Sequence, residues 1–101
     1  DEEMVEVEWS SQAAQDLDAI VGFIAKDSPQ YARLFVADIF RALDRIAAFP
    51  NSGRIVPESD NPAIREVIMG SYRVMFRVGK EKIGLITIHH GARLLDPDKI
   101  R

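Results

Sequence analysis

The sequence predicts an α+β fold in which an N-terminal strand is followed by an antiparallel two-helix hairpin and a three-stranded antiparallel meander, all in one domain spanning residues 1–101. Three observations predict it. Apolar and acidic residues alternate near the start, two apolar stripes at helical spacing follow, and a Gly-Ser pair later separates two strand-like runs. A chain of 101 residues is too short to divide into two separately stable cores.

The first half of the chain contains the expected strand and helix pair. Residues 5–9 alternate apolar and acidic side chains, which is typical of a strand with one buried face. Ser10 or Ser11 can cap a helix whose apolar stripe comprises Ala13, Leu17, Ile20, Val21 and Ile24. Residues 27–29 (Asp-Ser-Pro) end that helix and begin a second, which stops before Pro50. So short a connection predicts antiparallel packing of the two helices.

The second half predicts the meander. Residues 64–69 and 72–78 flank Gly70-Ser71, which suits a type II′ turn, and a four-residue reversal then leads into residues 83–90. Counting across both loops places His89 on the core face, where we expect a packing role. It places His90 on a second face that mixes apolar and basic groups, together with Arg73, Met75 and Arg77. We expect that second face to be a binding surface.

Composition excludes several classes of function. Apolar residues form 47% of the chain and charged residues 29%, as in an ordinary folded protein, and there is no cysteine for disulfides or thiolate chemistry. No apolar run could span a bilayer, and residues 1–4 are acidic where a secretory signal would be basic, so we expect a cytoplasmic location without membrane contact. No phosphate-binding glycine loop, metal-ligand spacing or serine triad is present, and we expect no cofactor and no metal.

The charge distribution points to the C-terminal half as the binding region. The formal net charge is −3, which is unusual for a protein that holds nucleic acid mainly through its phosphates. Residues 64–101 are nevertheless locally basic, with Arg65, Arg73, Arg77, Lys80, Lys82, Arg93, Lys99 and Arg101 against fewer acids. We therefore expect an acidic partner to meet this half of the chain.

The order of elements resembles the ParE/RelE toxin superfamily over nearly the whole chain. The resemblance includes residues 49–54 after the helices and is most specific in residues 64–78 and in residues 89–93 (His-His-Gly-Ala-Arg). It implies the toxin of a type II toxin-antitoxin system, bound by a cognate antitoxin as a hetero-oligomer. ParE-like members poison DNA gyrase, and RelE-like members cleave messenger RNA in the ribosomal A site, so the fold alone does not choose between them.

The residues that the resemblance implies for RNA cleavage are only partly present. Arg73 and Arg93 match two arginines of the RelE pattern, but Ile64 and Glu66 stand at its two lysine positions, and Lys99 stands at its C-terminal tyrosine position. RNA hydrolysis without a metal needs cations on the phosphate and proton donors and acceptors beside it. This departure favours a ParE-like gyrase inhibitor that is not an enzyme.

Three readings of the functional residues stay open. In the favoured reading no residue is catalytic, and the target and the antitoxin are bound through Arg65, Arg73, Arg77, His90 and Arg93. In the alternative, a metal-independent endoribonuclease uses Arg73, His90 and Arg93. In the third, the chain is an inactive homologue that retains only antitoxin binding. Each strand arginine can also be purely structural, with its stem covering apolar surface and its head paired with Glu66 or with acids of the helices.

Overall fold

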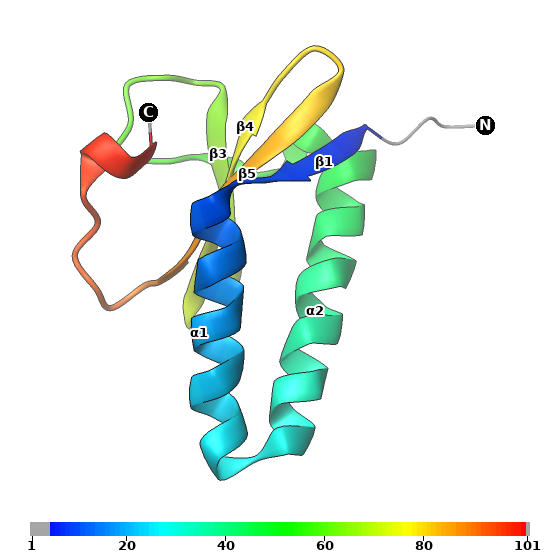
Figure 1. Cartoon of the computed structure of the whole chain (residues 1–101). Coiled ribbons are helices and arrows are strands. Elements are labelled where there is room, and N and C mark those ends of the chain that lie inside the picture. Colours follow the sequence, from blue (N-terminus) through cyan, green and yellow to red (C-terminus); the bar gives the residue numbers. More distant parts are fainter. Residues whose placement is uncertain (1–4, 101) are drawn as a thin grey trace.

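Residues 5–100 fold into two α-helices and a five-stranded sheet in the order that the sequence predicts, with one additional short strand (Figure 1). The computed structural model describes residues 5–100, so the acidic start and Arg101 lie outside the described residues. The elements are β1 (Glu6–Trp9), α1 (Ser11–Asp27), α2 (Pro29–Ala48), a 3₁₀ turn η1 (Pro50–Ser52), β2 (Arg54–Ile55), β3 (Ile64–Met69), β4 (Tyr72–Val78), β5 (Lys82–His90) and a 3₁₀ turn η2 (Pro97–Ile100).

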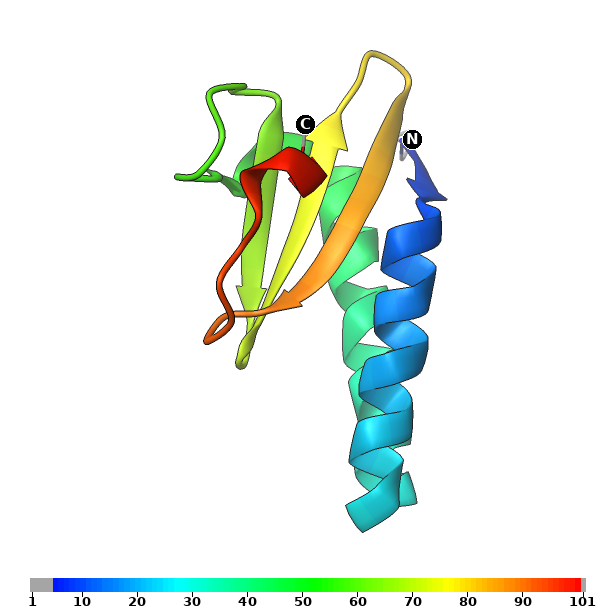
Figure 2. The ribbon, with the colours of Figure 1, turned by 60° about the vertical axis from the view of Figure 1, so that its left-hand side comes forward.

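Both helices begin at the serines that the sequence indicates. The Ser10 hydroxyl accepts a hydrogen bond from the Ala13 amide at 2.9 Å, and the Ser28 hydroxyl accepts one from the Tyr31 amide at 3.1 Å. Ser10, and not Ser11, is therefore the cap of α1, while Ser28 ends α1 and starts α2. The two helices run antiparallel, and the end of the hairpin that joins them extends beyond the sheet (Figures 1 and 2). No described helix is long and apolar enough to cross a membrane.

The sheet has the order β1-β5-β4-β3-β2, with β1 parallel to β5 and the other pairs antiparallel. Gly70 has a φ of 61°, and no described non-glycine residue has a positive φ, which fits the predicted type II′ turn. The β3–β4 register is also as predicted, with Met69 opposite Tyr72. Strand β2 was not expected, because a strand of two residues is too short to show alternation.

The predicted faces of the two histidines were wrong because β5 contains a bulge. Phe76 pairs with Leu85 as expected, but Met75 pairs with Thr87, so Ile86 is an extra residue in β5. Successive strand side chains point to opposite faces, and one extra residue exchanges every face that follows. Tyr72 therefore pairs with His90, and Arg73 pairs with His89.

Each face of the sheet is covered by its own apolar core. Toward the helices, the core consists of Ala13, Ile39, Leu43, Ile46, Val74, Phe76, Ile83, Leu85 and Ile88. Trp9 packs against it while remaining partly exposed, and its ring lies 5.9 Å from that of Phe40. On the far face, the C-terminal segment returns across the sheet (Figure 2), and the second core consists of Val56, Ile64, Met75, Leu95 and Ile100. The part of the predicted binding face around Met75 is therefore covered, whereas Arg73 on the same face lines a depression.

Helix α1 closes the edge of β5 where β1 no longer reaches. The Ser10 hydroxyl donates to the Ile86 carbonyl at 2.8 Å, and the Asp16 carboxylate accepts from the Ile88 amide at 3.1 Å and from the Thr87 hydroxyl. These bonds satisfy polar groups that an edge strand would otherwise leave unpaired. They also fix the end of β5, where His89 and His90 lie, against the first helix.

Candidate binding surface at the ends of β4 and β5

A cluster of charged side chains from β2, β3 and β4 is organised around one buried carboxylate, that of Glu66. Glu66 on β3 is 0% exposed, and its two oxygens accept hydrogen bonds from Arg54 Nε at 2.6 Å and from Arg73 Nε at 2.7 Å. A buried carboxylate is tolerated when it is paired and fully hydrogen-bonded. The Glu66 carboxylate is directed at these two arginines, and its single negative charge compensates one of their two positive charges.

Arg73 on β4 is engaged on a second side by Glu58, from the loop between β2 and β3. Its two terminal nitrogens donate to the two Glu58 oxygens at 2.9 and 2.7 Å, which is the bidentate geometry of strong guanidinium–carboxylate pairs. The Arg73 side chain is only 12% exposed. Hydrogen bonds to Glu58, and then to Glu66, raise the pKa of Arg73, while the hydrogen bond from Arg73 lowers the pKa of Glu58.

The lowered pKa of Glu58 predicts a pH-dependent contribution to stability. Because the folded-state pKa lies below the ordinary value of 4.5, Glu58 stabilises the fold above that pH, and the contribution is lost as the pH falls through the folded-state pKa. We expect Glu58→Gln to lower the melting temperature at neutral pH and to match the wild type in acid. Asp60→Asn, in the same exposed loop, serves as the control. A difference that persists unchanged in acid contradicts this assignment.

The two histidines at the end of β5 hold the turn that follows the strand. His90 Nδ1 accepts a hydrogen bond from the Ala92 amide at 3.1 Å, and His89 Nε2 lies 3.0 Å from the Arg93 carbonyl oxygen. The His90 ring also meets the Tyr72 ring edge-on at 5.1 Å, and Tyr72 meets Phe35 of α2 in the same way at 5.2 Å. The histidines therefore position the turn from Gly91 to Arg93 relative to the helices.

The other predicted arginines are distributed over different parts of the molecule. Arg65 donates to the Gly53 carbonyl at 2.8 Å and braces the chain after η1, which is a structural role. Arg77 lies at the opposite end of β4 from Tyr72 and makes no side-chain hydrogen bond or ion pair within residues 5–100. Arg93 is exposed in the segment after β5. The structure therefore brings together Arg73 and His90, and separately His90 and Arg93, but not all five residues.

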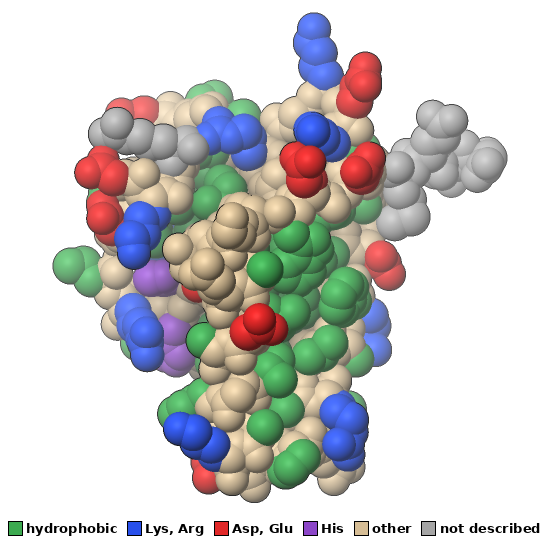
Figure 3. Space-filling view, in the orientation of Figure 1, with side chains coloured by type: hydrophobic (Ala, Val, Ile, Leu, Met, Phe, Trp, Pro, Cys, Tyr) green, Lys and Arg blue, Asp and Glu red, His purple; other side chains and the backbone are tan. Residues whose placement is uncertain are grey.

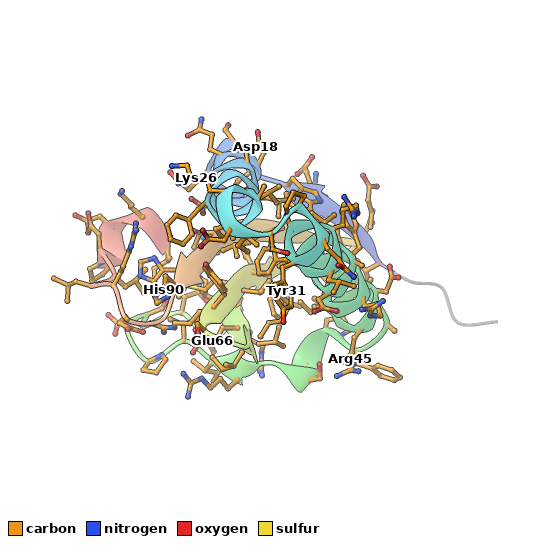
Figure 4. The ribbon with its side chains drawn as sticks, turned by 90° about the horizontal axis from the view of Figure 1, so that it is seen from below. Asp18, Lys26, Tyr31, Arg45, Glu66 and His90 are labelled. Carbon is orange, nitrogen blue, oxygen red and sulfur yellow. The ribbon has the colours of Figure 1, made fainter. Side chains whose placement is uncertain are left out.

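Two concave regions meet at Tyr72 and His90. A shallow depression of about 490 Å³ is lined by Arg54, Glu58, Tyr72, Arg73, His90 and Gly91, among others. A larger groove of about 1070 Å³ runs between α1 and the C-terminal segment, and its lining includes Ile20, Phe23, Lys26, His90, Arg93 and Leu94. Figure 3 shows the histidines beside lysine and arginine side chains on this side of the molecule, and Figure 4 shows Lys26 of α1 across from His90.

Several residues of this surface were not identified from the sequence. Glu58 and Arg54 lie in a stretch without periodicity, and nothing local shows that they converge on Arg73. Phe23 and Leu94 are 68% and 97% exposed. Phe23 lies between Val21 and Ile24, which belong to the apolar stripe of α1, but its own side chain faces away from the core. Within the described residues, no group of three or more histidine or acidic side chains could hold a metal ion.

The chain thus combines a helix hairpin over one face of a small sheet with a groove beside the end of β5 that is lined by exposed apolar side chains and by charges of both signs. The model of the ParE toxin family of the parDE type II toxin-antitoxin system matches residues 7–95. The chain therefore belongs to the ParE toxin family, within the ParE/RelE superfamily.

Individual relatives agree with the family assignment. The chain is 30% identical over 92 residues to toxin RelE2 of Caulobacter vibrioides, a match that covers 90% of this chain and 100% of that protein. It is similar to a chain of the chromosomal ParDE system of P. aeruginosa, with 28% identity, a TM-score of 0.69, and coverage of 86% of this chain and 96% of that one. A chain of the Mycobacterium tuberculosis RelBE2 toxin-antitoxin complex shares the fold at 17% identity, with a TM-score of 0.60 and coverage of 92% and 100%.

Proposed function

We propose that this toxin inhibits growth by poisoning DNA gyrase and that a cognate antitoxin neutralises it by binding the groove between α1 and the C-terminal segment. The observation that carries the choice of target is the engagement of Arg73. Three of its nitrogens are bonded to Glu58 and Glu66, so its charge is already compensated inside the protein. An arginine in that state contributes little to stabilising negative charge on a phosphate.

The surroundings of Arg73 also argue against RNA cleavage. The charges of Arg54, Arg73, Glu58 and Glu66 sum to zero. Glu66 could not be exchanged for the lysine of the RelE pattern, because an ammonium there would be buried beside two guanidinium groups. This part of the surface therefore lacks the excess positive charge that bound RNA would require.

The hydrogen bonds of His90 weaken the nuclease alternative further. Its Nδ1 lone pair accepts the Ala92 amide, so the neutral ring carries its proton on Nε2 and can donate there but not accept. A general base needs a free lone pair within reach of the proton that it abstracts. Of the two histidines, His89 is the one with a lone pair available, since its Nε2 faces the Arg93 carbonyl and its Nδ1 makes no hydrogen bond within residues 5–100.

The target is tested by assaying one preparation of the protein against DNA gyrase and against ribosome-bound messenger RNA. We expect purified toxin to block supercoiling by gyrase and to leave cleaved DNA, and to leave ribosome-bound messenger RNA intact in a translation extract. Arg93→Ala should reduce growth inhibition strongly while changing stability by less than about 0.5 kcal/mol, because Arg93 is exposed beyond the last strand. Arg41→Ala, on the exposed surface of α2, is the control.

The possible outcomes separate the three readings. Codon-specific cleavage of messenger RNA, with gyrase unaffected, would overturn the proposal in favour of an endoribonuclease. A protein that binds its antitoxin but does not inhibit growth would be an inactive homologue. If Arg93→Ala remains fully toxic or unfolds, Arg93 does not contact the target.

The groove supports an antitoxin segment with an apolar face flanked by charged residues. Phe23 and Leu94 are exposed apolar side chains within it, and the charged lining residues are of both signs: Lys26, Arg93 and Lys99, and Asp16, Asp18 and Asp96. Apolar anchors in a groove provide most of the affinity for such a segment, and the surrounding charges orient it.

We expect Phe23→Ser to weaken antitoxin binding by about 2 kcal/mol, or roughly thirtyfold in Kd. Phe49→Ser is the matched control, because Phe49 is 66% exposed, against 68% for Phe23, and does not line the groove. Titration calorimetry on the toxin and its antitoxin measures both. Equal losses for the two variants would place the antitoxin elsewhere.

A further inference from the structure

The Glu58 carboxylate binds Arg73 in the same way as the carboxylate of a separate ligand could. The Glu58 carboxylate lies across both terminal nitrogens of the guanidinium, and the Arg73 Nε is held separately by the buried Glu66. Glu58 belongs to the exposed loop between β2 and β3, and its side chain is 35% exposed. The two carboxylates on Arg73 therefore differ: one is part of the core of the site, and the other lies at its open side.

Removing the Glu58 carboxylate would leave the two terminal nitrogens of Arg73 as a positively charged site with a fixed orientation. Arg73 would remain oriented by Glu66, which in turn is held by Arg54 Nε at 2.6 Å. The remaining three charges sum to +1, which matches one monoanion. The fork of a guanidinium is complementary to a planar carboxylate, and a dianionic phosphate would bring a second negative charge close to Glu66.

We propose that Arg73 is an exchangeable carboxylate site, in which the acidic side chain of a protein partner displaces Glu58. The incoming carboxylate enters through the depression lined by Tyr72, Arg73, His90 and Gly91, on the side where the Glu58 side chain is partly exposed. In the free protein, Glu58 occupies the fork and lowers its affinity for other anions. The proposed function rests on Arg73 being held by Glu58, so this inference limits the displacing group to a carboxylate and does not extend to an RNA phosphate.

Chemical rescue tests the exchange. Glu58→Ala opens the fork, and Asp60→Ala removes an equivalent charge from the same loop without touching Arg73. The probe is N-acetyl-glutamate amide, which presents the acidic side chain alone, and N-acetyl-glutamine amide at matched ionic strength is its neutral counterpart. We expect the glutamate probe to raise the melting temperature of Glu58→Ala in a saturable way and to leave Asp60→Ala unchanged. By NMR of the Arg73 Nε–H, it should bind Glu58→Ala at least tenfold more tightly than the wild type.

A double variant and a second anion serve as further controls. The double variant Glu58→Ala/Arg73→Gln should lose the response, which assigns it to the fork. Inorganic phosphate should stabilise Glu58→Ala less than the glutamate probe does, and the reverse result would overturn the carboxylate assignment. Equal responses of Glu58→Ala and Asp60→Ala, or no response to either probe, would overturn the proposal. If Glu58→Ala is unfolded alone, its refolding with the glutamate probe supports the site, and failure to refold contradicts it.

Discussion

Replacing Glu66 with alanine is expected to destabilise the protein by about 3 kcal/mol, at the lower end of the range for breaking a buried ion pair. Glu66 is 0% exposed and accepts hydrogen bonds from Arg54 and Arg73. Its removal leaves a void beside two guanidinium groups that donated hydrogen bonds to it and removes one of the two negative charges that compensate them. The cost is moderated because Arg73 keeps Glu58, and because Arg54, with 59% of its side chain exposed, can turn to water.

Urea denaturation with a matched control measures this effect. Glu8→Ala removes an acid from the exposed pair with Lys82, whose side chains are 59% and 57% exposed, and it should cost less than about 1 kcal/mol. Glu66→Gln keeps the shape and should fall between the two. If Glu66→Ala is no more destabilising than Glu8→Ala, the charge cluster does not hold β2, β3 and β4 together.

Replacing Gly53 with alanine is expected to destabilise the protein by about 1–3 kcal/mol, the usual cost of overpacking. A Cβ at this position would lie 2.8 Å from the Phe76 Cζ and 2.9 Å from the Glu66 carbonyl oxygen. Phe76 is fully buried and Glu66 is held in the sheet, so neither can move without disturbing its neighbours. The Gly53 carbonyl also accepts the hydrogen bond from Arg65.

Gly22→Ala is the matched control, and we expect it to raise the free energy of unfolding, whereas Gly53→Ala lowers it. A Cβ on Gly22 meets nothing within 4 Å, and the residue lies inside α1, where alanine is favoured over glycine by about 1 kcal/mol. The two variants therefore add the same methyl group with opposite effects on the free energy of unfolding. Equal effects would mean that the contact between Gly53 and Phe76 does not limit packing after η1.

The local elements were predictable because their causes are local in the chain. The caps at Ser10 and Ser28, the break before Pro29 and the turn at Gly70 each depend on a few neighbouring residues. The β3–β4 register follows from the length of that turn. The bulge at Ile86 was not predictable in this way, because it depends on how β5 fits both β4 and α1, and it reversed the faces of His89 and His90.

The candidate site shows the same division. The sequence assigned the binding region to the locally basic C-terminal half and one face of the meander, and it named Arg65, Arg73, Arg77, His90 and Arg93. The structure places His90 where two concave regions meet and does not bring all five residues together. Glu66 was expected as a pairing acid for the strand arginines, and it does bind Arg73, whereas Glu58, which is 15 positions away in the chain, was not found. Their hydrogen bonds, and not the residue type, determine whether the arginine is available to a ligand.

The sequence by itself determined the α+β class, the helix hairpin, the meander and the resemblance to the ParE/RelE toxins, because periodicity, capping and turn chemistry act over short distances. Only the tertiary structure decided which face each histidine takes, that the C-terminal segment covers Met75, and that Arg73 is neutralised from within. These properties depend on contacts between residues far apart in the chain, where one additional residue in a strand or one carboxylate from a loop changes the outcome.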